Sequence, residues 1–378
     1  MIEIEEVVLH RLQMPLQMRF ETSFGVQTDR DVILAELRAA DGWVGWGESV
    51  ALRSPWYSEE TTDSVWDFLI NEAIPRILET TWDHPREFTH AMQKIHGNFM
   101  AKFTVEGALW DIWAQQQHQP LARVLGGTKT RVAVGVSIGI KPLEDLLDEV
   151  GQYVEAGYQR IKIKVKPGWD LEPIQAIRRA FPAVSLMVDA NTAYGSEHLN
   201  ILRAFDDWNL LMIEQPFPTE AWELSAHTQH LLKTPICLDE SICTLGDARR
   251  AIEMKACQII NVKLGRIGGI QPALDLAQLA EAHNVQLWCG GMLETGIGRS
   301  FNIAIATLSG FTLPGDTAAS QRYWKPDIIV PEVTVNAGHI TVPDIPGRGF
   351  EVNRELVNRY QWVQRHFRQG QTGNFWRW

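Results

Sequence analysis

The sequence predicts an α/β protein: a modified (β/α)8-type, TIM-like barrel with an α+β N-terminal capping domain that the C-terminal segment completes. Three observations lead to this prediction. Strand-like segments recur about every 25 residues in the middle of the chain, residues 1–125 lack that period, and strand-like pieces return after residue 325. We therefore expect a capping domain over 1–125, a barrel over 126–324 and a segment over 325–378 that runs back to the capping domain.

The barrel prediction starts from the stretch Arg160–Val165, which has the apolar, β-branched alternation of a strand. Side chains alternate between the two faces of a strand, so Lys162 and Lys164 share one face. Beyond Lys164, charged residues follow at the ends of strand-like segments in steps of 25, 25, 25 and 24 residues. They are Asp189, Glu214, Asp239 and Lys263. A strand, a helix and two short loops need about 25 residues, so these positions are equivalent points on consecutive parallel strands.

The remaining barrel strands lie on either side of this run. The segment Val132–Ile140 opens the barrel after a break at Gly126–Gly127, and it carries Ser137, 27 residues before Lys164. Segments 286–291 and 311–316 follow Lys263 and complete a set of eight predicted strands. The chain is short for this fold, so we expect the final helix to be short or absent.

In the capping domain, strands are expected before helices. The strands are predicted over Glu3–Leu12, Asp31–Ala39 and Gly42–Ser49, and the helices over 59–80, 84–97 and 101–117. Arg19–Gly25 and Leu52–Ser58 look like loops whose aromatic residues suit interdomain packing as well as ligand contact.

Composition limits the class of partner. The net charge of −11 argues against nucleic acid. The acidic start of the chain lacks the regions of a secretory signal, and no apolar run is long enough to span a bilayer, so no membrane partner is expected. The four cysteines include no Cys-x-x-Cys pair and are predicted to be free thiols. Together these features predict a cytoplasmic protein.

The acidic strand ends predict a metal site, because active sites of this fold lie at the C-terminal ends of the strands. A single carboxylate there is explained equally well by a loop-end cap or a salt bridge. Three carboxylates on adjacent strands raise one another's pKa and need a cation to stay ionised together. They belong to Asp189, Glu214 and Asp239. An all-oxygen site suits Mg²⁺, for which Mn²⁺ could substitute.

The lysines are expected to flank this metal, since Lys162 and Lys164 precede the first acid and Lys263 follows the last. Crowding and burial lower the pKa of a lysine, whereas nearby carboxylates raise it. A lysine with a lowered pKa is a competent general base. A base beside a metal that holds a small-molecule carboxylate predicts removal of the α-proton, with the metal stabilising the enediolate.

Several motifs carry a family resemblance. They are Lys162-x-Lys164, Asp189-Ala190-Asn191, Glu214-Gln215-Pro216, Asp239-Glu240-Ser241 and Lys263, with Ser23-Phe24-Gly25, Pro167–Asp170, Gly290–Gly296 and Leu313–Asp316. Together they resemble the muconate-lactonizing subgroup of the enolase superfamily, and within it the o-succinylbenzoate synthase and N-acylamino acid racemase family. The resemblance covers nearly the whole chain.

The resemblance implies a reaction on the menaquinone pathway. Lys164 would take the α-proton and return it to the departing hydroxyl, so that 2-succinyl-6-hydroxy-2,4-cyclohexadiene-1-carboxylate loses water to form o-succinylbenzoate. Lys263 would stabilise the enolate as a cation, or serve the opposite face in racemisation, and Lys162 would tune Lys164. The implied metal ligands are Asp189, Glu214 and Asp239, and the implied pocket residues are Asn191, Ser137, Met292, Phe20, Phe24 and Tyr57. A homo-oligomer is also implied.

Other functions stay open at this point. Racemisation of N-acylamino acids needs the same lysines, and so does muconate cycloisomerisation. Dipeptide epimerases have an Asp-x-Asp on the last strand, where this chain has Gly315 in place of one Asp, so this activity ranks lower. A non-catalytic barrel protein is disfavoured because the base and ligand positions are all filled.

Overall fold

An antiparallel sheet with strand order β15-β1-β2-β3 forms the core of the capping domain. The computed structural model describes residues 1–22 and 25–370, and its first sheet joins strands from both ends of the chain. The strands are β1 (Ile4–Thr22), β2 (Gly25–Ala39), β3 (Val44–Ser49) and β15 (Gln361–Arg368). The prediction of a loop from residue 19 was wrong, because the β1–β2 ladder shifts register after Pro15 and then resumes at Phe20. The two strands therefore form a longer hairpin than the sequence suggested.

Helices pack against one face of this sheet. They are α1 (Thr62–Phe68), the π-helical turn η1 (Leu69–Ala73), α2 (Ile74–Glu79), α3 (Pro85–Met92), α4 (Phe99–Gln116) and α5 (Leu121–Val124). The almost wholly buried α4 lies directly on β3. A Cβ atom on Gly47 would lie 1.8 Å from the backbone oxygen of Thr104, so only glycine permits this approach.

A parallel sheet with the order β11-β10-β9-β8-β7-β6-β5 forms the barrel in the described residues. Its strands are β5 (Gly135–Ile138), β6 (Arg160–Lys164), β7 (Leu186–Asp189), β8 (Ile213–Glu214), β9 (Ile236–Leu238), β10 (Ile259–Val262) and β11 (Gln286–Cys289). Parallel pairing sets Lys164 beside Asp189, and Asp189 beside Glu214. The period of about 25 residues is therefore one strand and one helix.

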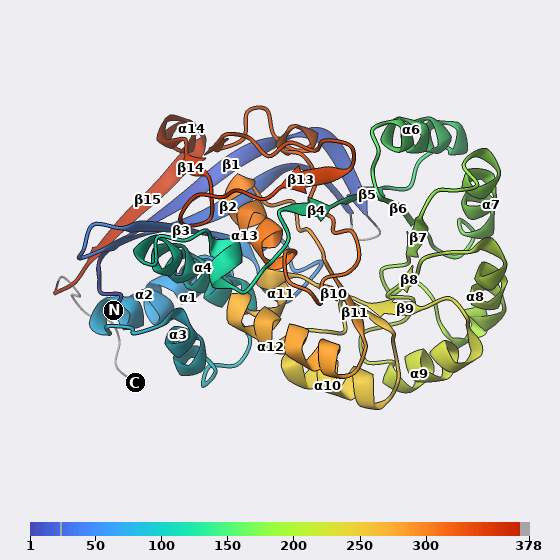
Figure 1. Cartoon of the computed structure of the whole chain (residues 1–378), viewed down its shortest axis with the longest axis horizontal. Coiled ribbons are helices and arrows are strands. Elements are labelled where there is room, and N and C mark those ends of the chain that lie inside the picture. The colour runs from blue at the N-terminus through green and yellow to red at the C-terminus, as the bar shows by residue number, and fades with distance from the viewer. Residues whose placement is uncertain (23–24, 371–378) are drawn as a thin grey trace.

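Helices alternate with the strands of the curled sheet, most of them on its outside (Figure 1). They are α6 (Leu143–Glu155), α7 (Leu171–Ala180), α8 (Leu199–Phe205), α9 (Trp222–Leu231), α10 (Leu245–Glu253), α11 (Leu264–Ile267), α12 (Ile270–Ala282) and α13 (Gly296–Ile305), with the short 3₁₀ turns η2 (Ser196–His198) and η3 (Asp206–Trp208).

The eighth predicted strand, 311–316, does not form a regular strand. An isolated bridge joins Gly315 to Val134, and the amide of Gly135 donates to the carbonyl of Gly315 over 2.7 Å. On the other side, the amide of Asp316 donates to the carbonyl of Cys289 over 2.9 Å. Pro314 has no N–H to donate, which limits a continuous ladder here. The segment still spans the gap between β11 and β5. The helix after it is reduced to the 3₁₀ turn η4 (Ser320–Arg322), in keeping with the short final helix that we expected.

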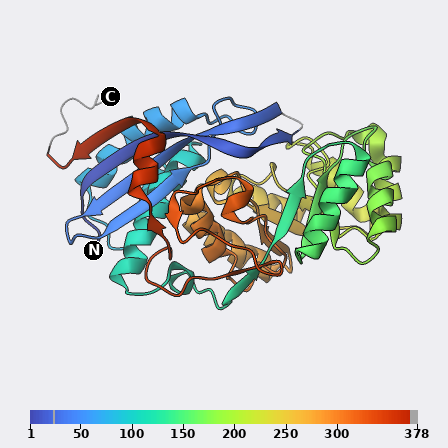
Figure 2. The same ribbon diagram turned by 90° about the horizontal axis from the view of Figure 1, so that it is seen from above.

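The C-terminal segment returns to the capping sheet, as Figure 2 shows for α14 (Arg354–Tyr360) and β15. β15 pairs antiparallel with β1, placing Arg368 opposite Glu6. On the way the chain forms two small ladders, in which β12 (Ile329–Val330) pairs with β14 (Glu351–Val352) and β13 (His339–Thr341) pairs with β4 (Arg131–Ala133). The domain boundaries near residues 125 and 324 stay predictions.

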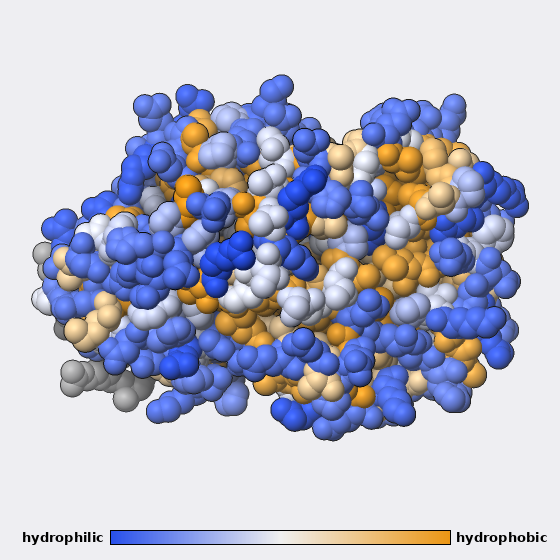
Figure 3. All heavy atoms as spheres, viewed as in Figure 1, coloured by the Kyte–Doolittle hydropathy of each residue, from blue (hydrophilic) through white to orange (hydrophobic). Residues whose placement is uncertain are grey.

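Hydrophilic side chains cover most of the face seen in Figure 3. Among the described residues, every helix is too short or too polar to cross a bilayer.

Candidate active site

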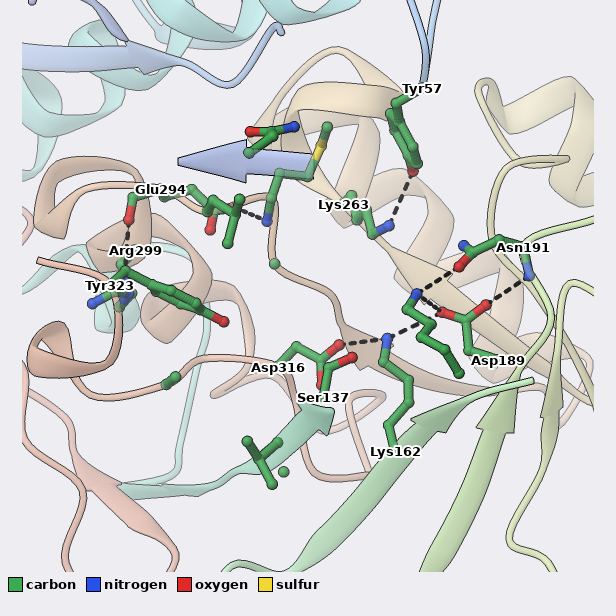
Figure 4. Close-up of a pocket in the computed structure, with 18 of the residues that line it drawn as sticks. Tyr57, Ser137, Lys162, Asp189, Asn191, Lys263, Glu294, Arg299, Asp316 and Tyr323 are labelled. Carbon is green, nitrogen blue, oxygen red and sulfur yellow. Dashed lines mark hydrogen bonds and ion pairs between the residues drawn. The ribbon is translucent and has the colours of Figure 1, made fainter. Parts of the chain in front are cut away.

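Most of the charged strand ends line one cavity between the barrel and the capping domain (Figure 4). Lys162, Lys164 and Asp189 line it from consecutive strands. The predicted pocket residues Ser137, Asn191, Met292 and Tyr57 also line it. Phe24 lies outside the described residues, and the side chain of Phe20 does as well. Leu52 and Trp56 reach the cavity from the same capping-domain loop as Tyr57, so both domains build the site.

Lys162 is buried among carboxylates. Its Nζ atom lies 2.6 Å from Oδ2 of Asp316 and 3.1 Å from Oε2 of Glu214. Burial lowers the pKa of Lys162, but Asp316, Glu214 and Asp189 together outweigh burial and raise the pKa overall. The expected lowering by crowding therefore does not occur at Lys162, because the carboxylates outnumber the neighbouring lysine.

Lys164, two residues further along β6, also lines the cavity. Its Nζ atom lies 2.6 Å from Oδ2 of Asp189 and 2.6 Å from Oδ1 of Asn191. Asn191 holds a left-handed backbone conformation with φ 42°, and its side-chain amide donates to Oε1 of Glu240 over 2.8 Å. Glu240 thus holds the side chain of Asn191 in position beside Lys164. Asp189 and Asn191, from one motif, both contact the same lysine.

Lys263 reaches the same cavity from the end of β10, with β7, β8 and β9 between its strand and that of Lys164. Its Nζ atom lies 2.7 Å from Oδ2 of Asp239 and 3.0 Å from the hydroxyl oxygen of Tyr57. Burial lowers the pKa of Lys263, whereas Tyr57, Glu240 and Glu214 raise it overall. A capping-domain side chain therefore contacts the lysine on the far side of the cavity.

All three predicted metal ligands are buried, but only Asp189 lines the cavity, whereas Glu214 and Asp239 reach it through their ion pairs with Lys162 and Lys263. Burial raises the pKa of Glu214, and the neighbouring Asp189 raises it further. Burial also raises the pKa of Asp189, but Lys164 and Lys162 bring it down to about 2. Buried carboxylates that raise one another's pKa are stabilised in their charged form by a divalent cation, so the chemistry of the donor set fits one.

The arrangement of these oxygens is nevertheless not yet that of a metal centre. In the described residues no group of three His, Cys, Asp or Glu side chains is placed to hold an ion. The ammonium groups of Lys162, Lys164 and Lys263 lie against the carboxylate oxygens instead. Binding of a cation would therefore require these lysines to release the oxygens.

Several residues of the site were not assigned a role from the sequence. Arg160 and Lys162 both bind Asp316, and Arg266 binds Asp239. Asn261 donates to Oε1 of Glu214 over 2.8 Å. Arg160 could have been found, because it lies two residues before Lys162 and so on the same face of the strand. Asn261 gives the same signal, because it lies two residues before Lys263. Arg266 gives none, since it lies beyond the strand and off the charge period.

Two family models match consecutive parts of the chain. The model described as "Mandelate racemase / muconate lactonizing enzyme, N-terminal domain" matches residues 3–126, and the model described as "Enolase C-terminal domain-like" matches residues 145–356.

Three similar proteins span nearly all of the chain. An o-succinylbenzoate synthase from Geobacillus kaustophilus is 50% identical, covering 95% of this chain and 96% of that protein. An N-succinylamino acid racemase from Thermus thermophilus is 43% identical, covering 97% of this chain and 99% of that protein. The crystal structure of an enolase superfamily member from Listeria innocua superposes with a TM-score of 0.96 at 37% identity, covering 98% of this chain and 100% of that one.

Proposed function

Because the chain belongs to the enolase superfamily, in the mandelate racemase and muconate lactonizing enzyme family, we propose that it removes the proton α to a carboxylate. The chain is thus an enzyme, and divalent metal dependence is general in its superfamily. The reaction that we propose is the o-succinylbenzoate synthase reaction of menaquinone biosynthesis. The observation that carries this proposal is the placement of Lys164 and Lys263 on strands at opposite sides of one cavity.

In this reaction Lys164 takes the α-proton of 2-succinyl-6-hydroxy-2,4-cyclohexadiene-1-carboxylate. The same ammonium group then gives a proton to the departing hydroxyl, so that water leaves and the ring becomes aromatic. Lys164 is the better placed base, because its side chain is the most exposed of the three lysines, at 12% against 5% for Lys162 and 10% for Lys263. Lys263 stays protonated and stabilises the enolate electrostatically, which agrees with the direction of its pKa.

We propose that Asp189, Glu214 and Asp239 hold Mg²⁺. Bound there, the ion would stabilise the negative charge that develops on the substrate carboxylate. Lys162 lies behind Lys164 with its charge held by Asp316 and Glu214. We infer that it tunes Lys164 without touching the substrate.

Racemisation of N-succinylamino acids is the second candidate. It needs a base on each face of the α-carbon, and Lys164 and Lys263 line the cavity from strands that three others separate. Dipeptide epimerisation is less well supported, because Asp316 is already engaged by Arg160 and Lys162 and is not free to bind a substrate ammonium group.

Turnover assays with Mg²⁺ and each substrate test the proposal. We expect the wild-type protein to consume the cyclohexadiene carboxylate and Lys164→Ala to lose this activity. Exchange of the α-proton of N-succinyl-L-methionine with deuterium from the solvent reports the base directly. A rate equal to that of the metal-free sample, or equal exchange by wild type and Lys164→Ala, would exclude this role for Lys164.

A further inference from the structure

A second cavity adjoins the active-site cavity inside the capping domain. It lies between residues 26–31 at the start of β2 and residues 52–54 after β3, with Trp56. Gln27, Leu52 and Trp56 line both cavities. The two cavities therefore adjoin, and a ligand held by the lysines would reach the second one past these three side chains.

The acidic residues of the second cavity already have cationic partners. Both side-chain oxygens of Asp31 accept from Arg11, at 3.0 Å from Nε and 2.5 Å from Nη2. Oδ1 of Asp29 lies 2.9 Å from Nη2 of Arg53. Each of these carboxylates is thus neutralised by an arginine other than Arg30.

Of the two arginines that line this cavity, Arg53 has an ion-pair partner and Arg30 has none among the described residues. Arg30 is 2% exposed, and its Nη2 atom donates to the carbonyl oxygen of Val50 over 3.0 Å. Its Nε atom is buried without a hydrogen-bond partner, and in the part of the chain that the structure describes Arg30 forms no ion pair. Leaving a buried guanidinium unpaired is costly, so the fold keeps a cation here at the expense of stability.

Two other carboxylates influence Arg30 but are bonded elsewhere. Burial lowers the pKa of Arg30, and Glu48 and Glu294 act in the opposite direction. Glu48 accepts from the amides of Thr295 and Gly298 at the start of α13. Glu294 accepts from the amide of Met292 over 2.9 Å. Neither is free to serve as the partner of Arg30.

We propose that Arg30 binds the second carboxylate of the substrate, the one at the end of a succinyl arm, and that this cavity selects substrates with such an arm. This inference rests on the proposed function, because both candidate substrates carry a succinyl carboxylate in addition to the one at the reacting carbon. A guanidinium with an unpaired Nε edge matches a carboxylate through two parallel hydrogen bonds. The reacting carboxylate stays with the lysines while the arm passes Gln27, Leu52 and Trp56.

Two ligands that differ only at the end of the arm test this subsite. o-Succinylbenzoate has the terminal carboxylate, and 2-butanoylbenzoate has a methyl group in its place. In calorimetric titrations of the Mg²⁺-loaded protein, we expect Arg30→Met to weaken o-succinylbenzoate binding by about tenfold or more. The dissociation constant of 2-butanoylbenzoate should change by less than about twofold.

Arg53→Met is the matched control, because Arg53 lines the same cavity but is paired with Asp29 and half exposed. It should leave the ratio of the two dissociation constants unchanged. Arg30→Lys keeps the charge without the two-pronged geometry, so it should weaken o-succinylbenzoate in the same direction by a smaller factor. This variant also serves if Arg30→Met does not fold by circular dichroism.

The outcomes separate the subsite from the proposed reaction. Equal losses for both ligands in the Arg30 variants, or a wild-type protein that binds both ligands equally, would overturn the subsite even if the enzyme turns over. A selective loss in a protein that does not turn over the cyclohexadiene carboxylate would support the subsite and reject the reaction. N-succinyl- and N-acetyl-L-methionine provide the same contrast in racemisation.

Discussion

The Nζ atom of Lys162 lies 2.6 Å from Oδ2 of Asp316, which joins β6 to the segment that closes the barrel. Asp316 also binds the fully buried Arg160. Two cations from one strand thus share one carboxylate contributed by the place where an eighth strand was expected. This ion-pair cluster adds to the two backbone hydrogen bonds that join Gly315 to Ala133 and Gly135 at the start of β5.

Replacement of Asp316 should therefore destabilise the fold. In Asp316→Asn the buried Arg160 loses its carboxylate partner and Lys162 loses one of its three, so we expect the free energy of unfolding to fall by about 3–5 kcal/mol. Urea unfolding followed by fluorescence measures this change. Asp207→Asn removes an exposed carboxylate and should stay within about 0.5 kcal/mol of wild type. A similar small change in Asp316→Asn would show that the cluster does not support barrel closure.

Glu36 binds Arg354 of the C-terminal segment, so protonation of Glu36 in acid should weaken the attachment of that segment to the capping sheet. Burial raises the pKa of Glu36, but His10, Arg354 and Arg38 lower it to about 2. The folded-state pKa lies below the ordinary value of 4.5, so the stabilisation is present above pH 4.5 and is lost as the pH falls towards 2. The full effect is at most about 3 kcal/mol.

Unfolding free energies measured between pH 7 and pH 3 test this expectation. Glu36→Gln should lower stability at pH 7 and flatten the acid limb of the profile. Glu5→Gln changes an exposed glutamate of the same sheet and should keep the wild-type slope. Parallel acid limbs for wild type and Glu36→Gln would contradict the assignment.

The sequence predicted the barrel and its charged rim because both depend on a short-range pattern, the repeat of strand and helix. At the eighth position the prediction fails only in regularity, since 311–316 forms backbone hydrogen bonds to both neighbouring strands but an isolated bridge in place of a regular strand. The extension of β1 beyond Pro15 depends on pairing with β2, which is a tertiary effect. Contacts such as Arg266 with Asp239, and the unpaired Arg30, arise from chain packing and have no local signature.

Two buried glutamates of the capping domain cap barrel helices in the same way. Oε1 of Glu48 accepts from the amide of Thr295 over 2.8 Å at the start of α13. Oε2 of Glu106 accepts from the amide of Ile270 over 2.6 Å at the start of α12. Burial raises the pKa of each glutamate to about 7. The first of these helices directly follows the cavity-lining stretch 291–294, whereas the second does not border the cavity.

Variants of Glu48 and Glu106 distinguish an effect on stability from an effect on substrate binding. Glu48→Gln and Glu106→Gln each place an amide donor against backbone N–H groups, so each should lose about 1–3 kcal/mol of stability. Only Glu48→Gln should raise KM, by about fivefold for each 1 kcal/mol of lost binding, with kcat little changed. Denaturation and steady-state kinetics on both variants measure this. A KM increase of the same size in Glu106→Gln would mean that domain docking in general, and not the 291–294 wall, sets KM.

Removal of the divalent cation should stop turnover and leave the fold intact. In this structure Lys164 lies against Asp189 and Lys263 against Asp239, so ammonium groups can neutralise the carboxylates without an ion. A buried charge with a partner is tolerated, whereas an unpaired one is strongly destabilising. We therefore expect EDTA to abolish activity with little change in the far-ultraviolet circular dichroism spectrum, and Mg²⁺ to restore activity. Lys263→Met removes one of the neutralising ammonium groups, so in this variant EDTA should lower the unfolding temperature more than in wild type. Unfolding of the wild-type protein by EDTA would show that the lysines do not stand in for the cation.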